Sequence, residues 1–195
     1  MSYSINNPTF VNIPEKFKTT RTLISIYKPG DGKDFLHFIK ANFDHLQEEF
    51  GEINSLNSVQ DAEAYILSRR EEWLSRKRFV PKIINKSDGR MIGQLWIEPR
   101  WDRMLFEIGY CLEEKSQGQG FATETVKKMI SFLFTELNAN KLEILTKATN
   151  ERSIGIPVRC GFTKEAQLRE RSRTNAGEAV DLLIFGLLKR EYKGK

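Results

Sequence analysis

The segment Gln117-Gly118-Gln119-Gly120-Phe121-Ala122 constrains the fold more than any other stretch of the chain. It lies between an apolar run that is predicted to be a strand, Leu105 to Leu112, and a segment with helical periodicity. Glycine lets a turn approach a ligand without a Cβ clash, and the N–H groups at a helix N-terminus attract anions. The turn therefore predicts a strand–turn–helix unit that can bind a pyrophosphate group.

The segment after the turn has the apolar spacing of a helix that packs on a sheet. Its apolar residues recur at i, i+4, i+7, i+8, i+11 and i+15: Ala122, Val126, Met129, Ile130, Leu133 and Leu137. Neither Gly-x-x-x-x-Gly-Lys-Ser/Thr nor a Gly-x-Gly-x-x-Gly dinucleotide fingerprint occurs in the chain. Kinase-like and dinucleotide-binding functions are therefore disfavoured, and a glycine-rich turn that binds nothing is the plain alternative.

The chain up to Leu112 predicts an arm, two helical segments and four strands. Residues 1–20 include two prolines and little periodicity, which indicates an extended N-terminal arm. Helical spacing follows at residues 33–46, and Asp61 is placed as the capping-box acid of a helix that starts at Ser58. Strands are expected at Thr22–Tyr27, Phe79–Ile84, Met91–Ile97 and Leu105–Leu112, the last three as an antiparallel meander with a loop around Pro99.

The second half predicts a strand, a short helix and a closing hairpin. These are Lys141–Thr146, Glu151–Arg159 with Asn150 as its cap, and Phe162–Arg171 with Glu178–Leu188. Helices set among strands of both orientations predict an α/β (α+β type) fold with a mixed sheet. A length of 195 residues with 39% apolar residues fits one domain over residues 21–195.

Several classes of protein are disfavoured by the composition. No stretch approaches the ~20 apolar residues of a membrane span, and the polar N-terminus has no signal-peptide order, so the expected location is cytoplasmic. Cys111 and Cys160 form no Cys-x-x-Cys pair, and both histidines lie in the N-terminal helical region, so no metal site is predicted. The net charge of +5 is spread along the chain, which leaves nucleic-acid binding through basic clusters a minor hypothesis.

The turn also carries a family resemblance. Gln117, Gly120 and Ala122 meet the pattern Gln-x-x-Gly-x-Ala, which resembles the CoA-pyrophosphate turn of the GNAT superfamily of acetyl-CoA-dependent N-acetyltransferases. Four further blocks match in spacing: Glu107-Ile108-Gly109-Tyr110, Ala122-Thr123-Glu124, Asn150-Glu151-Arg152-Ser153 and Cys160-Gly161-Phe162. Over about Thr22 to Tyr192 the chain is similar to the branch that contains the bacterial ribosomal-protein alpha-N-acetyltransferases.

This resemblance implies a specific fold and cofactor. The fold is a mostly antiparallel central sheet that splays between two central strands, with helices on both faces. The strands ending near Leu112 and Thr146 would expose backbone groups that pair with the pantetheine arm of acetyl-CoA. The residues implied in binding this cofactor are Tyr110, Cys111, Leu112, Gln117, Gly118, Gln119, Gly120, Phe121, Ala122, Thr123, Asn150 and Ser153.

The resemblance also implies the acceptor. It is a primary amine, first of all the N-terminal amino group of a ribosomal protein or peptide, and a homodimer is compatible with the branch. Polyamines, antibiotics and other small amines are acceptors of related enzymes, and a CoA-binding module with weak catalysis is a further alternative. The acceptor is expected to enter near Trp73, Trp101 and Arg173, unless these are core or rim residues.

Acetyl transfer to an amine needs a base, and two carboxylates are candidates. Glu107 lies in the strand that leads to the turn, although a solvent-facing strand glutamate is equally consistent with the alternation. The ribosomal branch suggests a carboxylate on the strand after Gly-Phe, where this chain has Ser172. Glu170 is two residues away and is expected on the same strand face.

The leaving thiolate needs an acid. Many GNAT members use a tyrosine seven residues after the asparagine of Asn-x-x-Ala/Ser, but Pro157 occupies that position here. The ribosomal branch implies Ser153 instead, and a hydroxyl bonded to the helix backbone is the plain alternative. A buried structural thiol is favoured for Cys111 over a nucleophile.

Overall fold

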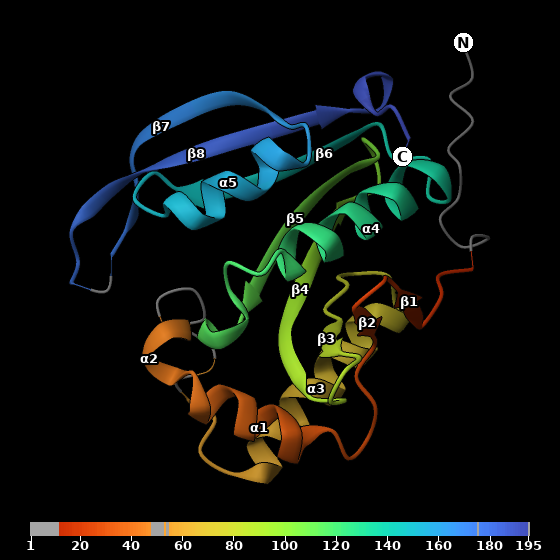
Figure 1. Ribbon diagram of the computed structural model, residues 1–195, viewed down its shortest axis with the longest axis vertical. Coiled ribbons are helices and arrows are strands. Elements are labelled where there is room, and N and C mark those ends of the chain that lie inside the picture. Colours follow the sequence, from red (N-terminus) through yellow and green to blue (C-terminus); the bar gives the residue numbers. More distant parts are fainter. Residues whose placement is uncertain (1–11, 48–52, 54, 175, 195) are drawn as a thin grey trace.

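The computed structural model describes residues 12–47, 53, 55–174 and 176–194. At its centre is one sheet with the strand order β1-β2-β3-β4-β5-β6-β8-β7 (Figure 1). The strands are β1 Lys16–Lys18, β2 Thr22–Ser25, β3 Lys82–Asn85, β4 Met91–Arg100, β5 Leu105–Leu112, β6 Lys141–Lys147, β7 Thr163–Arg173 and β8 Ala179–Leu188. All neighbours pair antiparallel except β5 and β6, which are parallel. The predicted mixed, mostly antiparallel sheet is confirmed.

Helices cover both faces of this sheet (Figure 1). They are α1 Gly32–Ala41, α2 Phe43–Leu46, α3 Val59–Leu74, α4 Phe121–Thr135 and α5 Glu151–Arg159. Buried residues of α4 and α5 share one apolar cluster with the sheet and with Trp73 of α3, and those of α1 share another with Ala62 and Ile66 of α3. Among the described residues, none of the helices has the length and apolar character needed to cross a membrane.

The two central strands separate along their length. β5 and β6 pair only over their first three residues, from Leu105↔Lys141 to Glu107↔Glu143. Beyond that point each strand continues to pair with its outer neighbour, to Leu112 on β5 and to Lys147 on β6. The sheet therefore splays between two central strands, as expected, and α4 and α5 lie over the gap (Figure 1).

Local sequence signals set the helices beside this gap. Gly118 and Gly120 have φ angles of 71° and 82°, which a side chain would disfavour, and Gly120 is the N-cap of α4. Asn150 caps α5, because its side-chain Oδ1 accepts a hydrogen bond of 3.0 Å from the Ser153 N–H. The capping box predicted between Ser58 and Asp61 is also present at the start of α3.

The predicted N-terminal arm is partly wrong. Residues 1–11 lie outside the described residues, but β1 belongs to the sheet and pairs with β2. Phe17 is buried between the exposed Lys16 and Lys18, so the strand does alternate. Three residues are too few for that alternation to be detected from the sequence.

The predicted loop around Pro99 is also wrong. Pro99 lies within β4 and faces Phe106 of β5, and the turn comes later, at residues 101–104. On the other side of β4, the last pairing in the described part of the chain is the bridge between Phe79 and Ile97. A proline that lacks an N–H is tolerated in a strand at such an edge position.

Candidate functional site

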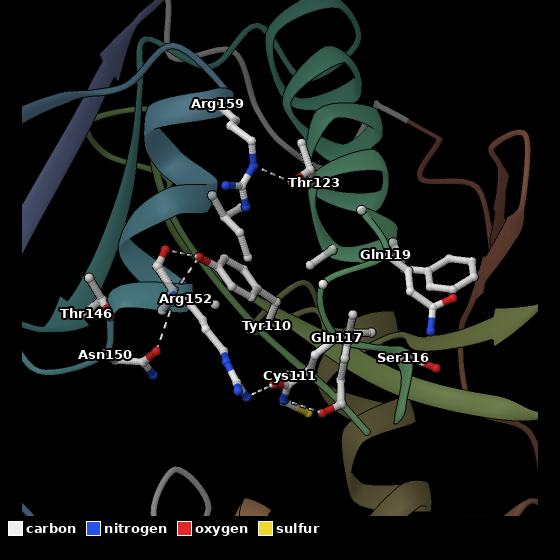
Figure 2. A pocket seen from close by; sticks show the side chains of 18 of the residues that line it. Tyr110, Cys111, Ser116, Gln117, Gln119, Thr123, Thr146, Asn150, Arg152 and Arg159 are labelled. Atoms are coloured by element: carbon white, nitrogen blue, oxygen red, sulfur yellow. Dashed lines mark hydrogen bonds between the residues drawn. The ribbon is translucent and has the colours of Figure 1, made fainter. Parts of the chain in front are cut away.

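A pocket of about 950 Å³ lies where β5 and β6 separate. The turn between β5 and α4 lines one wall, and the first turn of α5 lines the facing wall (Figure 2). The structure brings all of the residues implied in cofactor binding to this pocket: Tyr110, Cys111, Leu112, Gln117, Gly118, Gln119, Gly120, Phe121, Ala122, Thr123, Asn150 and Ser153. Glu107 and Glu170 are not among the lining residues.

The turn has the properties of an anion site. The N-cap of α4 is a glycine with no side-chain hydrogen bond to the helix, so the cap leaves the N–H groups of the first turn to a ligand. A Cβ at Gly118 would meet no atom within 4 Å, and one at Gly120 would lie 3.3 Å from Nη2 of Arg21. The positive φ angles therefore account for these glycines better than crowding does.

Three arginines lie around the turn, and one of them, Arg21, is ion-paired with Glu124 at 2.7 Å. The guanidinium of Arg152 donates to Oε1 of Gln117 at 2.7 Å, and Arg159 donates to Oγ1 of Thr123 at 3.3 Å (Figure 2). Arg21 donates to the Gln119 carbonyl at 2.8 Å and lies 4.5 Å from the centroid of the Phe121 ring. Guanidinium groups at a helix N-terminus favour phosphate oxygens.

Sequence reasoning missed these arginines. Arg152 lies within the Asn-Glu-Arg-Ser block, and Arg159 follows seven residues later on the same helix face, so a helical projection could have found both. Arg21 is 98 residues from Gln119, and no local pattern indicates that contact.

The pocket passes through the sheet. On the α4 and α5 side it is lined by Tyr110 and Ile156, which pack with the cluster under those helices. On the other side it is lined by Leu46, Trp96 and Cys111, which pack with α1 and α3. An extended ligand can therefore reach from the turn to the opposite face of the sheet.

The opposite face depends on a close contact between Trp96 and Gly109. The two residues face each other across β4 and β5, and a Cβ at Gly109 would lie 1.8 Å from Nε1 of the Trp96 indole. This strand position therefore requires glycine as long as the indole lies over it.

Gly109→Ala is expected to displace the Trp96 indole and to lower the stability by roughly 1–3 kcal/mol, as overpacking does. Thermal melting measures this effect. The double variant Gly109→Ala/Trp96→Ala should melt close to Trp96→Ala alone, because the clash is removed. A double variant that loses the full sum of both single effects would rule out the steric explanation.

Glu107 lies on the same strand face as Gly109, two residues before it, and is next to the pocket-lining Ile108 in the sequence. It stands in a row of carboxylates at facing positions of β4, β5 and β6, between Glu98 and Glu143. Its neighbours are paired, Glu98 with Arg78 at 3.1 Å and Glu143 with Lys141 at 2.8 Å. Glu107 itself makes no hydrogen bond or ion pair with the residues that the structure describes.

Burial raises the pKa of Glu107 above its ordinary value of 4.5, and the charge of Glu98 raises it further, against the effect of Arg100. A carboxylate with a raised pKa is a stronger base and accepts a proton more readily. The alternation that places Glu107 opposite Phe106 and Ile108 is confirmed, since those two residues are fully buried on the other face.

Ser153 lies in the first turn of α5, and its hydroxyl contacts a side chain from another element. Its Oγ lies 3.2 Å from Oη of Tyr110, and the Tyr110 hydroxyl also donates to the Ser153 carbonyl at 3.0 Å. In Figure 2 the Tyr110 ring points from β5 toward this turn of α5. The Ser153 hydroxyl therefore has a phenol as its neighbour inside the pocket.

The expectation that Glu170 shares a strand face with Ser172 is wrong. The register of β7 and β8 shifts between Leu168 and Ser172, and Glu170 has a φ of 52° within this irregular stretch. Its side chain is exposed, and its N–H donates to Oδ1 of Asp181 at 2.9 Å. A bulge breaks the two-residue alternation on which the expectation depended.

The aromatic residues expected near the acceptor entrance belong to the core. Trp73 is 4% exposed, and Trp73 and Trp101 both pack edge-to-face against Phe79. Arg173 donates to the Gly177 carbonyl near the end of the β7–β8 hairpin. The tryptophan that does line the pocket is Trp96. Its position depends on the contact with Gly109 across β4 and β5, which the sequence does not indicate.

Both cysteines are free thiols in the structure. Burial raises the pKa of Cys160 to about 11, and Cys111 is buried where it lines the pocket.

Cys111→Ala is expected to keep kcat within about threefold of the wild-type value, because the volume change is small and a buried thiol is a poor nucleophile. Near-complete loss of kcat in a folded variant would contradict this expectation.

Within the described part of the chain, no cluster of three His, Cys, Asp or Glu residues is arranged to hold a metal ion.

Known proteins share this sequence pattern and fold. Residues 22–163 match the family model described as an acetyltransferase (GNAT) domain. Over 88 residues the chain is 42% identical to "Uncharacterized N-acetyltransferase p20" of Bacillus licheniformis, covering 45% of this chain and 49% of that protein. Over 89 residues it is 37% identical to "Putative ribosomal N-acetyltransferase YdaF" of Bacillus subtilis (strain 168), covering 46% and 48%. The matched part of the chain thus spans about half the length of these two relatives.

Two further similarities cover more of the chain. A "Spermidine N(1)-acetyltransferase" of Vibrio cholerae is 26% identical over 119 residues, which cover 60% of this chain and 66% of that protein. The crystal structure of a "Probable acetyltransferase" superposes with a TM-score of 0.83 and 25% identity, covering 91% of this chain and 98% of that one.

Proposed function

The chain belongs to the acetyltransferase (GNAT) family, and from this premise we propose that it is an acetyl-CoA-dependent N-acetyltransferase that transfers the acetyl group directly to a primary amine. The observation that carries this proposal is the pocket that runs from the anion-binding turn through the splayed sheet. A donor bound on one face can thereby meet an acceptor that enters from the other.

The residues around the pocket fit acetyl-CoA. The turn from Gln117 to Ala122 would hold the pyrophosphate, with Arg152 and Arg159 as nearby cations. The pantetheine arm would lie between β5 and β6, where the two strands no longer pair with each other. When bound, acetyl-CoA supplies an acetyl group that is activated as a thioester.

Glu107 is the base in this proposal. It accepts the proton of the acceptor ammonium through water, since it lies on the same strand face as Gly109, two residue pairs beyond the Trp96–Gly109 contact that lines the pocket. Ser153 lies at the other wall and provides the hydroxyl on the side of the leaving thiolate. No covalent enzyme intermediate is required.

The acceptor in this proposal is the N-terminal amino group of a protein or peptide, and a ribosomal protein is the first candidate. The similarity to a relative named as a ribosomal N-acetyltransferase supports this choice. An α-amino group has a pKa of roughly 7.7 to 8.0, so a carboxylate can assist its deprotonation at modest cost.

A small cationic amine is the second candidate acceptor. The row of Glu98, Glu107 and Glu143 on the acceptor face would attract ammonium groups, and a spermidine acetyltransferase is among the similar proteins. Lys141 and Arg78 neutralise part of this charge, which weakens the attraction.

Calorimetric titration with acetyl-CoA and CoA, followed by an acceptor panel of peptides and polyamines, tests the proposal. Micromolar binding with acetylation of peptide N-termini supports the protein acceptor. Acetylation of small amines but never of peptides would remove it. Binding without turnover on any acceptor would indicate a CoA-binding module, and the absence of binding would refute the acetyltransferase proposal and favour salt-dependent nucleic-acid binding.

A further inference from the structure

A proline inside α5 leaves one carbonyl group without its usual partner. In an α-helix the carbonyl of residue i accepts the N–H of residue i+4, and for Ser153 that residue is Pro157, which has no N–H. Tyr110 of β5 fills this role, since its hydroxyl donates to the Ser153 carbonyl at 3.0 Å. The same proline that excludes a tyrosine from α5 thus attracts a tyrosine hydroxyl from the neighbouring strand.

This contact places a phenol beside a pocket-lining hydroxyl. Oη of Tyr110 also lies 3.2 Å from Oγ of Ser153, and both side chains line the pocket. A phenol has one proton to donate, so two arrangements exist. In the first, Tyr110 donates to the carbonyl and the Ser153 hydroxyl donates to Tyr110. In the second, Tyr110 donates to Oγ, and the Ser153 proton is free to point into the pocket.

We propose that Tyr110 and Ser153 form the proton-donating pair for the leaving thiolate of CoA, an inference that rests on the proposed function. An S–H bond forms as the Oγ–H bond of Ser153 breaks, and Oγ takes the proton of Tyr110. Tyr110 regains its proton from the water that carries the proton released by the acceptor amine. No other reactant is needed.

The pair has an advantage over serine alone. A phenol has a pKa of about 10 and a thiol one of about 8.5, so the two groups are matched closely enough for proton transfer. A serine hydroxyl holds its proton much more tightly than a phenol does. Ser153 therefore contacts the thiolate as the catalytic residue, while Tyr110 acts through it.

The competing explanation is that Tyr110 only satisfies the free carbonyl of α5. Tyr110→Phe removes both hydrogen bonds but keeps the ring, and Ser153→Ala removes only the hydroxyl partner. Thermal melting detects the structural role. A proton-donating role also changes the pKa of the CoA thiol in the complex, which the structural role alone would leave unchanged.

The deciding measurement is the pKa of the thiol of bound CoA. It is determined from the thiolate absorbance as the pH is varied, and the complex with desulfo-CoA serves as the reference for the absorbance of the protein thiols. Hydroxyl donors stabilise the thiolate, so Tyr110→Phe should raise the pKa of the bound thiol by about one unit or more. The Kd of CoA should stay within about threefold of the wild-type value. This titration needs no acceptor and remains valid if the acceptor proposal fails.

Kinetics with an acceptor from the panel give the second readout. Tyr110→Phe and Ser153→Ala should each lower kcat by about 10²-fold with little change in KM, as expected for a general acid. The double variant should be no more than about threefold slower than the slower single variant, because the two hydroxyls act as a unit. An unchanged thiol pKa together with an unchanged kcat would overturn the pair. Loss of CoA binding by folded Tyr110→Phe would also overturn it and assign Tyr110 to cofactor binding.

Discussion

Replacing Gly120 with glutamate is expected to abolish acetyl-CoA binding. Gly120 is the N-cap of α4 and has a φ of 82°, directly in the turn that would hold the pyrophosphate. Gly120→Glu introduces a carboxylate that competes for the same N–H groups and for Arg21, whose Nη2 would lie 3.3 Å from the new Cβ. The variant therefore carries its own anion into the site.

The electrostatic penalty is large compared with the strain. Two unit charges about 4 Å apart repel by roughly 4 kcal/mol at an effective dielectric constant of about 20, which corresponds to roughly 10³ in affinity. A positive φ at a residue other than glycine costs only about 1–2 kcal/mol of stability, and an acidic side chain at a helix N-terminus recovers part of it. The fold should therefore survive while the Kd of acetyl-CoA rises at least 100-fold.

Gly89→Glu is the matched control. Gly89 also has a positive φ, 73°, and lies in the turn between β3 and β4, outside the pocket. It should show the same strain in thermal melting and an unchanged Kd in calorimetry. Equal binding by Gly120→Glu and the wild type would place the cofactor elsewhere, and equal losses in both variants would indicate a general effect of strain.

The cofactor side of the site could be predicted from the sequence because its residues are local. The turn from Gln117 to Ala122 and the capped start of α5 are each short contiguous segments, and their backbone geometry follows from glycine and from Asn150. The local backbone conformation of such a segment depends on its own residues more than on how the strands of the sheet pair. The splay between β5 and β6, by contrast, was implied only by the family resemblance, because no short segment of either strand encodes where their pairing stops.

The acceptor side could not be predicted in the same way because its contacts join distant segments. Trp96 lines the pocket only because β4 sets it opposite Gly109, and Arg21 approaches Gln119 across the fold. The bulge that displaces Glu170 depends on how β7 pairs with β8. Likewise, the sequence shows that Pro157 occupies the position of α5 where many GNAT members have a tyrosine. Only the folded structure shows that the hydroxyl of Tyr110, from β5, lies next to Ser153.

Replacing Glu107 with glutamine is expected to stop catalysis and to stabilise the protein at pH values above the folded pKa of this group. As the proposed base, Glu107 contributes about 10²- to 10⁴-fold to kcat, so Glu107→Gln should lose that factor while acetyl-CoA still binds. Steady-state kinetics and calorimetry measure the two quantities. Glu98→Gln is the control, because Glu98 faces Glu107 across the strands but is paired with Arg78 at the surface.

The gain in stability follows from the sign of the pKa shift. Burial raises the pKa of Glu107, so the folded protein binds this proton more tightly than the unfolded chain does. The resulting stabilisation is complete below the unfolded pKa and is lost as the pH rises through the folded pKa. Above the folded pKa the wild type carries the ionised group and lacks this stabilisation, whereas the neutral amide of Glu107→Gln has no charge to bury. The melting temperature of the variant should therefore exceed that of the wild type once the pH is above the folded pKa, and the difference should shrink as the pH falls toward the ordinary value of 4.5.

The Glu98→Gln control separates the effect of the negative charge at Glu98 from the loss of the proposed base, Glu107. Because the charge of Glu98 raises the pKa of Glu107, Glu98→Gln should move the acid limb of kcat to lower pH and leave the plateau unchanged. A Glu107→Gln variant that is more stable but fully active would show that the buried carboxylate is not the base. The ionised form of a buried carboxylate costs stability, and proton transfer from the acceptor amine is the role that we propose for this carboxylate beside the pocket.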